Sequence, residues 1–199
     1  MKNIIKILIW NLLLISCGNK SEHKKMPEIQ KIEQSFITIH EINKELIDVD
    51  IDSIADFNSL INIIEEISCG GQIGLVKMET KDKIFRVQPL FSCGDIFDYK
   101  LRQIIYVNPD SVTVNSELNY PISDLKMVLQ KHIHNSENDK NYPEQDKIRM
   151  ISINVGNDKP ISITKNLILE IIYKLNELDY KNNLSFKLEN HDIIKAINE

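Results

Sequence analysis

The spacing of apolar residues changes along the chain and predicts a series of short strands and helices. From Phe36 to Asp50, apolar positions alternate on both sides of a polar centre at Asn43–Lys44, which predicts a β-hairpin. A competing interpretation extends a helix from Pro27, with these apolar residues along one side: Ile29, Ile32, Phe36 and Ile39. The pattern leaves both open.

A helix is predicted to begin at Ser53, which would cap it, and to end at about Ile67. Asp56 would occupy its third position. Its apolar residues recur at helical spacing and form one stripe: Phe57, Leu60, Ile61, Ile64 and Ile67.

Two strand-like segments, Gln72–Glu79 and Lys83–Gln88, flank a three-residue loop and predict a second hairpin. If Glu79 pairs with Lys83, Cys69 lies opposite Cys93, at the ~4.5 to 5.5 Å Cα separation that a disulfide tolerates. This register would place the following residues on one buried face: Ile73, Leu75, Phe85, Val87 and Phe91. The sequence therefore predicts a Cys69–Cys93 disulfide that closes the open end of the hairpin. A redox-active or metal-binding pair is the alternative, but the Cys-x-x-Cys spacing is missing.

The C-terminal half shows a clearer order of elements. It begins with a predicted hairpin of Ile104–Val107 and Val112–Val114, followed by a helix from Ser123 whose apolar stripe is Leu125, Val128, Leu129 and His132. A polar and mobile loop over His134–Asp146 leads to a strand over Lys147–Val155. The last predicted elements are a helix from Thr164 with the stripe Ile168, Ile171, Ile172, Leu175 and Leu178, a strand over Leu184–Leu188, and a short closing helix capped by Asn190.

This order predicts an α+β fold, with small mixed sheets and helices packed on one face. An offset of 68 residues aligns Phe36–Ile39 with Ile104–Val107, and Ile54–Phe57 with Ile122–Leu125. The two halves, 28–101 and 102–199, are therefore interpreted as two α+β modules that share a hairpin–helix–strand order.

The first sixteen residues are predicted to form a cleavable leader. Lys2 and Lys6 precede a short apolar run and a small residue, which is the pattern of a secretory signal peptide over residues 1–16. Leu14-Ile15-Ser16-Cys17 resembles a bacterial lipobox, and the resemblance implies cleavage before Cys17 and a diacylglycerol on its sulfur. The polar residues 17–27 would then be a flexible tether. The alternative is an uncleaved anchor, although the apolar run is shorter than the about 20 residues of a membrane-spanning helix.

Charge and cysteine content bear on which partners and which cellular compartment the protein can have. The chain carries a net charge of −5, which becomes −7 without Lys2 and Lys6, and basic clusters are missing, so nucleic-acid binding is excluded. Once Cys17 is assigned to the lipid, Cys69 and Cys93 remain as an even pair suited to an oxidising compartment.

No pattern points to catalysis or to a cofactor. His132 and His134 lie two residues apart near Glu137 and Asp139, and on a helix their rings would diverge, which argues against a metal site. An acidic run could attract Ca²⁺, but it lacks the glycine and terminal glutamate of an EF-hand loop: Asp48, Asp50, Asp52 and Asp56. Phosphate-binding loops and hydrolase motifs are not found. We therefore expect a protein that is not an enzyme.

The C-terminal half resembles the periplasmic domain of the ExbD/TolR biopolymer-transport family over roughly Ile104 to Leu188. The segments that carry the resemblance are Ile105–Asn115, Ile122–Leu125 and Ile151–Lys159. The family carries a membrane-buried aspartate that moves protons, whereas this leader has Asn11 and no acidic residue. The resemblance therefore implies a docking domain without motor chemistry.

These observations together predict a non-enzymatic lipoprotein on the periplasmic side of the cell envelope. It would use sheet edges or a helix face to bind another envelope protein, as a monomer or a homodimer. Gly18 follows the acylated cysteine where enterobacterial lipoproteins retained in the inner membrane carry aspartate, which favours the outer membrane. The alternative is a periplasmic small-ligand-binding protein with a pocket near the Cys69–Cys93 hairpin.

Overall fold

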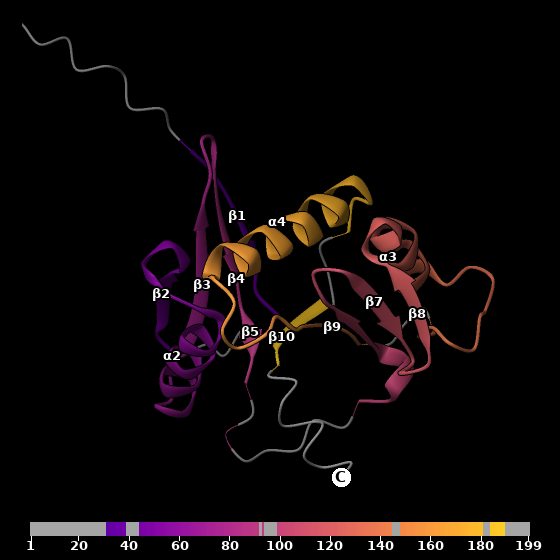
Figure 1. The fold of residues 1–199 in the computed structure, drawn as a ribbon, viewed down its shortest axis with the longest axis horizontal. Helices are drawn as coiled ribbons and strands as arrows, with labels where there is room; N and C mark the ends of the chain where they lie inside the picture. Colours follow the sequence, from indigo (N-terminus) through magenta and orange to yellow (C-terminus); the bar gives the residue numbers. More distant parts are fainter. Residues whose placement is uncertain are drawn as a thin grey trace, which may run out of the picture. The chain divides into compact units, whose positions relative to one another are not determined.

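Two mixed sheets and three α-helices make up the part of the chain that the computed structural model describes, which is residues 31–38, 44–91, 93, 99–144, 148–180 and 184–189 (Figure 1). The predicted α+β class is confirmed. The predicted leader, the predicted lipid site at Cys17, the predicted tether, the turn residue Asn43 and the predicted closing helix at Asn190 lie outside the described residues.

The four-stranded sheet has the order β1-β4-β3-β2, with β1 at Ile32–Phe36, β2 at Leu46–Asp50, β3 at Ile73–Glu79 and β4 at Lys83–Val87. The predicted hairpin between the first two strands is wrong, because β1 and β2 occupy opposite edges and each runs parallel to its neighbour. The alternative helix from Pro27 is also wrong over Ile32–Phe36, which is a strand. Alternation identifies a strand and its buried face, but it does not identify the partner.

The β3–β4 hairpin is present, but its register differs by one residue from the predicted register. Glu79 pairs with Ile84 instead of Lys83. The longer turn is closed by Thr80, whose backbone N–H donates to the Lys83 carbonyl at 2.9 Å and whose hydroxyl accepts from the Lys83 N–H at 3.1 Å. Because of this shift, the side chains of Val76 and Met78 lie in the main core with Phe85 and Val87, where the predicted register had placed Ile73 and Leu75.

Helix α2 spans Phe57–Cys69 and begins four residues after the predicted start. Its N-cap is Asp56, whose carboxylate accepts a hydrogen bond from the Ser59 N–H at 2.8 Å, and this bond lowers the pKa of Asp56. Ser53 instead belongs to a short 3₁₀ helix, η1, at Ile51–Ser53. The predicted stripe is confirmed: Phe57, Leu60, Ile61 and Ile64 are buried, and Ile67 packs against the core.

The six-stranded sheet has the order β5-β10-β9-β6-β7-β8. Its strands are β5 at Pro89–Leu90, β6 at Ile104–Val107, β7 at Ser111–Val114, β8 at Leu118–Pro121, β9 at Arg149–Ile153 and β10 at Leu184–Leu188, with a 3₁₀ helix η2 at Leu101–Gln103 before β6. The β6–β7 hairpin, β9 and β10 were predicted, whereas β8 was missed. All five residues of β9 are buried, and Ile151 and Ile153 belong to the main core.

Two helices accompany this sheet. Helix α3 spans Leu125–His134 after a 3₁₀ helix, η3, at Ile122–Asp124, so Asp124 and not Ser123 stands at its N-cap. Helix α4 spans Ile161–Glu177 and begins after Pro160, three residues before the predicted cap Thr164, which is buried inside the first turn. Proline is well suited to the start of a helix, because it has no backbone N–H and would disrupt the helix at an interior position.

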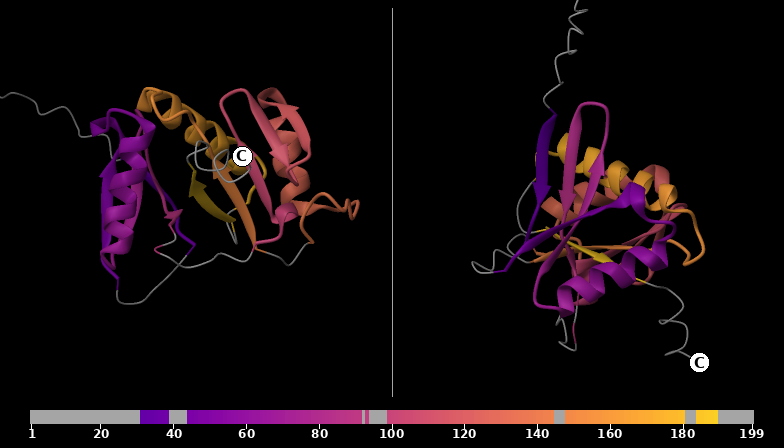
Figure 2. Two further views of the ribbon diagram at one scale, coloured as in Figure 1. Left: turned by 60° about the horizontal axis from the view of Figure 1, so that its bottom comes forward. Right: turned by 90° about the vertical axis from the view of Figure 1, so that its left-hand side faces the viewer.

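Helix α4 contacts both sheets, although its sequence belongs to the predicted C-terminal module (Figures 1 and 2). At its start, Lys165 forms an ion pair with Asp52 at 2.6 Å. Near its end, the amides of Gln34 and Asn176 exchange hydrogen bonds of 2.6 and 3.1 Å, and the ring of Tyr173 lies edge-on to Phe85. Residues 31–199 accordingly form one compact unit.

The strand pairing differs between the two halves of the chain. The first half has parallel edge strands around one hairpin, whereas the second begins with the β6–β7–β8 antiparallel meander. The predicted shared order of hairpin, helix and strand is therefore not found in the first half. None of the helices among the described residues is long and apolar enough to span a bilayer.

Candidate docking surface on helix α3

Helix α3 separates its residues into a buried and an exposed stripe. Leu125, Val128, Leu129 and His132 are buried, as the sequence predicted. The opposite stripe has the same helical spacing and consists of Met127, Gln130, Lys131 and His134. Met127 is 40% exposed and lies among polar and charged side chains of this stripe, and we take this face as the candidate contact surface.

The loop after α3 is organised by Asn135, although the sequence predicted a mobile segment. Asn135 has a left-handed backbone with φ of 36°, a conformation that asparagine tolerates. Its side-chain Nδ2 donates to the carbonyls of Asp139 and Pro143 at 3.1 and 3.0 Å, and its Oδ1 accepts from the Asp139 N–H at 2.8 Å. The buried amide therefore holds the loop in one shape.

The helix stripe and this loop line an open cavity of about 200 Å³. We call its lining the α3 surface: Met127, Gln130, Lys131, His134, Asn135, Ser136, Glu137 and Asp139. It carries charges of both signs, and Lys131 lies 3.9 Å from Glu137. The surface offers one thioether, several hydrogen-bonding groups and a small recess.

The support beneath the α3 surface is buried and hydrogen-bonded. Arg149 on β9 is 3% exposed, and its guanidinium donates to the backbone carbonyls of His132 at 2.8 Å and Glu144 at 3.2 Å. These bonds tie the end of α3 and the end of the loop to the sheet. Burial raises the pKa of Tyr142, whose ring is also inside this region.

His132 is fully buried, and neither ring nitrogen has a hydrogen-bond partner in the described structure. Burial, with a smaller contribution from the charge of Arg149, lowers the pKa of His132 to about 3. The ring is therefore neutral at physiological pH and packs as part of the core. His134, two residues later, is exposed, so the two rings diverge as the helical spacing predicts.

The acidic run considered for Ca²⁺ is divided among separate structural contacts. Asp48 binds Arg86 and Asp52 binds Lys165, while Asp50 and Asp56 cap η1 and α2. Among the described residues, no group of three or more histidines, cysteines or carboxylates is arranged to hold a metal ion.

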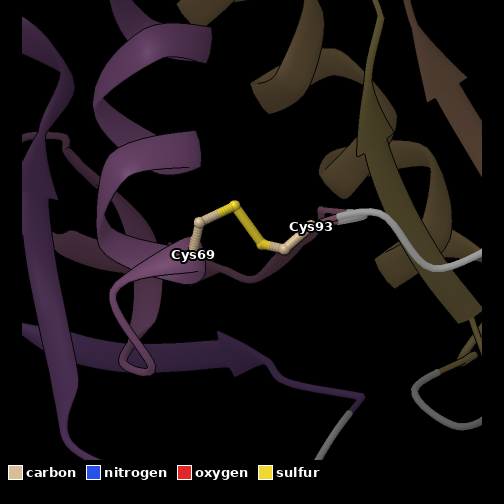
Figure 3. Close-up of a disulfide and its surroundings, with 2 residues drawn as sticks. All are labelled: Cys69 and Cys93. Atoms are coloured by element: carbon tan, nitrogen blue, oxygen red, sulfur yellow. A yellow bond between two sulfur atoms is a disulfide. The ribbon is translucent and has the colours of Figure 1, made fainter.

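Cys69 and Cys93 form a disulfide with a Cα separation of 5.4 Å (Figure 3). The predicted pairing of the two cysteines is thus found, but its position in the fold is not the predicted one. Cys69 is the last residue of α2, and Cys93 follows the short strand β5. The bond therefore joins a helix beside the four-stranded sheet to the segment that follows the first strand of the six-stranded sheet. Both cysteines are exposed.

The cavity on α3 does not involve the disulfide, near which the small-ligand alternative placed a pocket. Sequence reasoning also missed Asn135 and Arg149. An arginine inside an apolar strand is the one signal that could have identified Arg149 as a buried structural residue, because an arginine is almost never buried without partners. Asn135 carries no comparable signal, since asparagine is common in solvated loops.

No protein-family model matches the chain, and no curated protein or solved structure is significantly similar to it.

Proposed function

We propose that the protein is a non-enzymatic, lipid-anchored protein of the bacterial cell envelope that binds another envelope protein through the α3 surface. The lipid would be attached at Cys17 after removal of residues 1–16, and the folded part would lie on the periplasmic side. No cofactor takes part in this function.

The envelope location is supported by two independent features of the chain. One is the leader with its lipobox-like Leu14–Cys17. The other is the disulfide between Cys69 and Cys93, because exposed disulfides persist in the periplasm and are reduced in the cytosol.

The observation that carries the docking role is the size and setting of the cavity on α3. Its volume of about 200 Å³ is below the range of about 300–1,000 Å³ that is usual for small-molecule sites. A recess of this size, beside an exposed Met127 and on a loop fixed by Asn135, suits one protruding side chain of a protein partner. This favours a protein partner over a small ligand.

The resemblance to ExbD/TolR periplasmic domains supports a partner in the envelope. Between Ile104 and Leu188 the described elements follow in the order β6, β7, β8, α3, β9, α4 and β10, which is the predicted hairpin, helix, strand, helix and strand with β8 added before α3. Because one fold can serve many functions, this support is by analogy only.

Crosslinking in intact cells tests the proposal. A photoreactive amino acid replaces Met127 in the producing bacterium, and the control replaces Leu101, which is 54% exposed and lies outside the α3 surface. We expect one discrete crosslinked protein from position 127 that is missing from position 101. Lys131→Glu should reduce this adduct several-fold, because reversing a charge at a docking rim weakens association.

Two results would contradict the proposal. Equal labelling of the same proteins from both positions would show that the α3 surface has no selective partner. Metabolic labelling with palmitate tests the anchor separately, and a mature product without lipid would remove the assignment of Cys17.

A further inference from the structure

We infer that the end of the four-stranded sheet formed by the start of β1 and the β3–β4 turn is a second membrane contact, one that rests against the anionic lipid headgroups of the bilayer holding the acyl anchor. We call this end the sheet tip and define it as Lys31, Ile32 and residues 79–83. The inference rests on the proposed acylation of Cys17.

The first argument is where the chain enters the described unit. Ile32 is the second residue of that unit, and its N–H donates to the Asp82 carbonyl in the β3–β4 turn at 3.0 Å. Ile32 also lies opposite Lys83 in the parallel pairing of β1 and β4. Figure 1 shows the β3–β4 turn beside the start of β1. The segment that would connect to the lipid therefore enters the fold directly at the sheet tip.

The second argument is the reach of that segment. Thirteen residues, 18–30, separate Cys17 from Lys31. If these residues form the flexible tether that the sequence predicts, their root-mean-square end-to-end distance is about 20 Å, and the sheet tip would remain within a short distance of the bilayer surface.

The third argument is the distribution of charge. Residues 17–31 and 79–83 carry a net charge of +2: their lysines are Lys20, Lys24, Lys25, Lys31, Lys81 and Lys83, and their acids are Glu22, Glu28, Glu79 and Asp82. The mature chain would carry a net charge of −7, so the rest of it would carry −9. An anionic surface attracts the first part and repels the second, which orients the protein with the sheet tip toward the bilayer.

The fourth argument is an exposed apolar side chain at the same place. Ile32 is 65% exposed, which is the highest value among the large apolar side chains of the described residues. An apolar residue beside lysines is the combination that interfacial membrane contacts use, because the apolar group enters the headgroup region while the lysines bind the phosphates.

The test uses the acylated full-length protein with a single tryptophan as reporter. The chain's only tryptophan is Trp10, which lies in the leader, so the mature protein would contain none. Ile32→Trp places the reporter at the sheet tip. Leu46→Trp is the matched control, because Leu46 is 51% exposed but pairs with Ile73 at the opposite end of β3, about 20 Å away. Each variant is mixed with vesicles of phosphatidylethanolamine and phosphatidylglycerol that contain bromine-labelled lipid.

We expect the tryptophan emission of the Ile32→Trp variant to shift to shorter wavelength and to be quenched at least about twofold more than that of the Leu46→Trp variant. Adding Lys81→Glu and Lys83→Glu should reduce the quenching at position 32 to the level at position 46. Equal quenching at both positions in protein that floats with the vesicles would overturn this inference and leave the acyl anchor intact. Protein that does not float would overturn both the anchor and the inference.

Discussion

His132 is a fully buried histidine in the last turn of helix α3. Its place in the apolar stripe of α3 predicted that it is buried, and it is. Spacing could not show that both ring nitrogens would lack a hydrogen-bond partner, because this depends on β9 and the loop, which are distant in sequence. A buried polar ring without partners lowers stability, so His132 is a position where an apolar residue could replace it.

The protonation of His132 should make the folded state sensitive to mild acid. The folded-state pKa of about 3 lies below the ordinary value of 6.5, so between these values the unfolded chain binds a proton that the folded chain excludes. The free energy of unfolding should therefore be lower at pH 5 than at pH 7 by about 2 kcal/mol from this residue alone. Urea denaturation at the two pH values measures the difference.

His132→Phe is the control for this pH effect. It keeps a ring of similar shape and removes the titrating group, so its stability at pH 7 should be close to that of the natural protein. Its loss of stability at pH 5 should be smaller by the same about 2 kcal/mol. An unchanged pH dependence in His132→Phe would assign the acid sensitivity to other groups.

At the scale of elements, the chain's helices were easier to predict than the pairing of its strands. The stripes of α2, α3 and α4 were correct because a helix is defined by contacts within one segment. Strand β2 was also recognised, whereas the predicted first strand began at Phe36, where β1 ends. The partners of β1 and β2 are β4 and β3, up to about fifty residues away along the chain. Strand pairing depends on such distant contacts, which a local pattern does not contain.

The disulfide was predicted from a register that the structure does not have. The pair is found because Cys69 and Cys93 flank the same hairpin, and a shift of one residue still leaves the two flanking segments close. Its actual position changes its expected role. It holds the segment after β5, and β5 pairs with β10 through only two residue pairs.

Removing the disulfide should therefore loosen the edge of the six-stranded sheet. In Cys69→Ser/Cys93→Ser, the free energy of unfolding should fall by up to about 3.5 kcal/mol, which is the loop-entropy value for a ring of this size. Hydrogen exchange should accelerate first at the Leu90 amide and along β10, because β5 pairs with β10 through only two residue pairs and Pro89 has no amide hydrogen. Urea denaturation and exchange mass spectrometry measure the two effects.

Reduction of the natural protein with dithiothreitol is the matched control, since both cysteines are exposed and accessible to the reagent. It should reproduce the exchange pattern of the double variant. Slow exchange in β5 after reduction would contradict the role of the bond as a clamp on this edge.

At the scale of the whole molecule, the sequence divides the chain into two modules, whereas the contacts of α4 connect them. Lys165, Tyr173 and Asn176 all reach residues of the first half, and the main core includes residues from both sheets. The interpretation as separate modules followed from the repeated order of elements. It could not take account of one helix packing against two sheets, because the amphipathic stripe of α4 has the same spacing for one sheet or two.

Tyr173 provides a direct test of whether the two halves unfold together. Its ring contacts Phe85 at a centroid distance of 5.8 Å, so Tyr173→Ala should lower the free energy of unfolding by about 1–2 kcal/mol. If α4 joins the halves into one cooperative unit, the slowest-exchanging amides of β6 and β9 should lose as much protection as those of β3 and β4, although Phe85 lies only in the four-stranded sheet. Tyr173→Phe keeps the ring and should leave both sheets unchanged. Loss of protection confined to β3 and β4 would instead show that the modules at 28–101 and 102–199 unfold independently, and that α4 supports the first sheet without coupling it to the second.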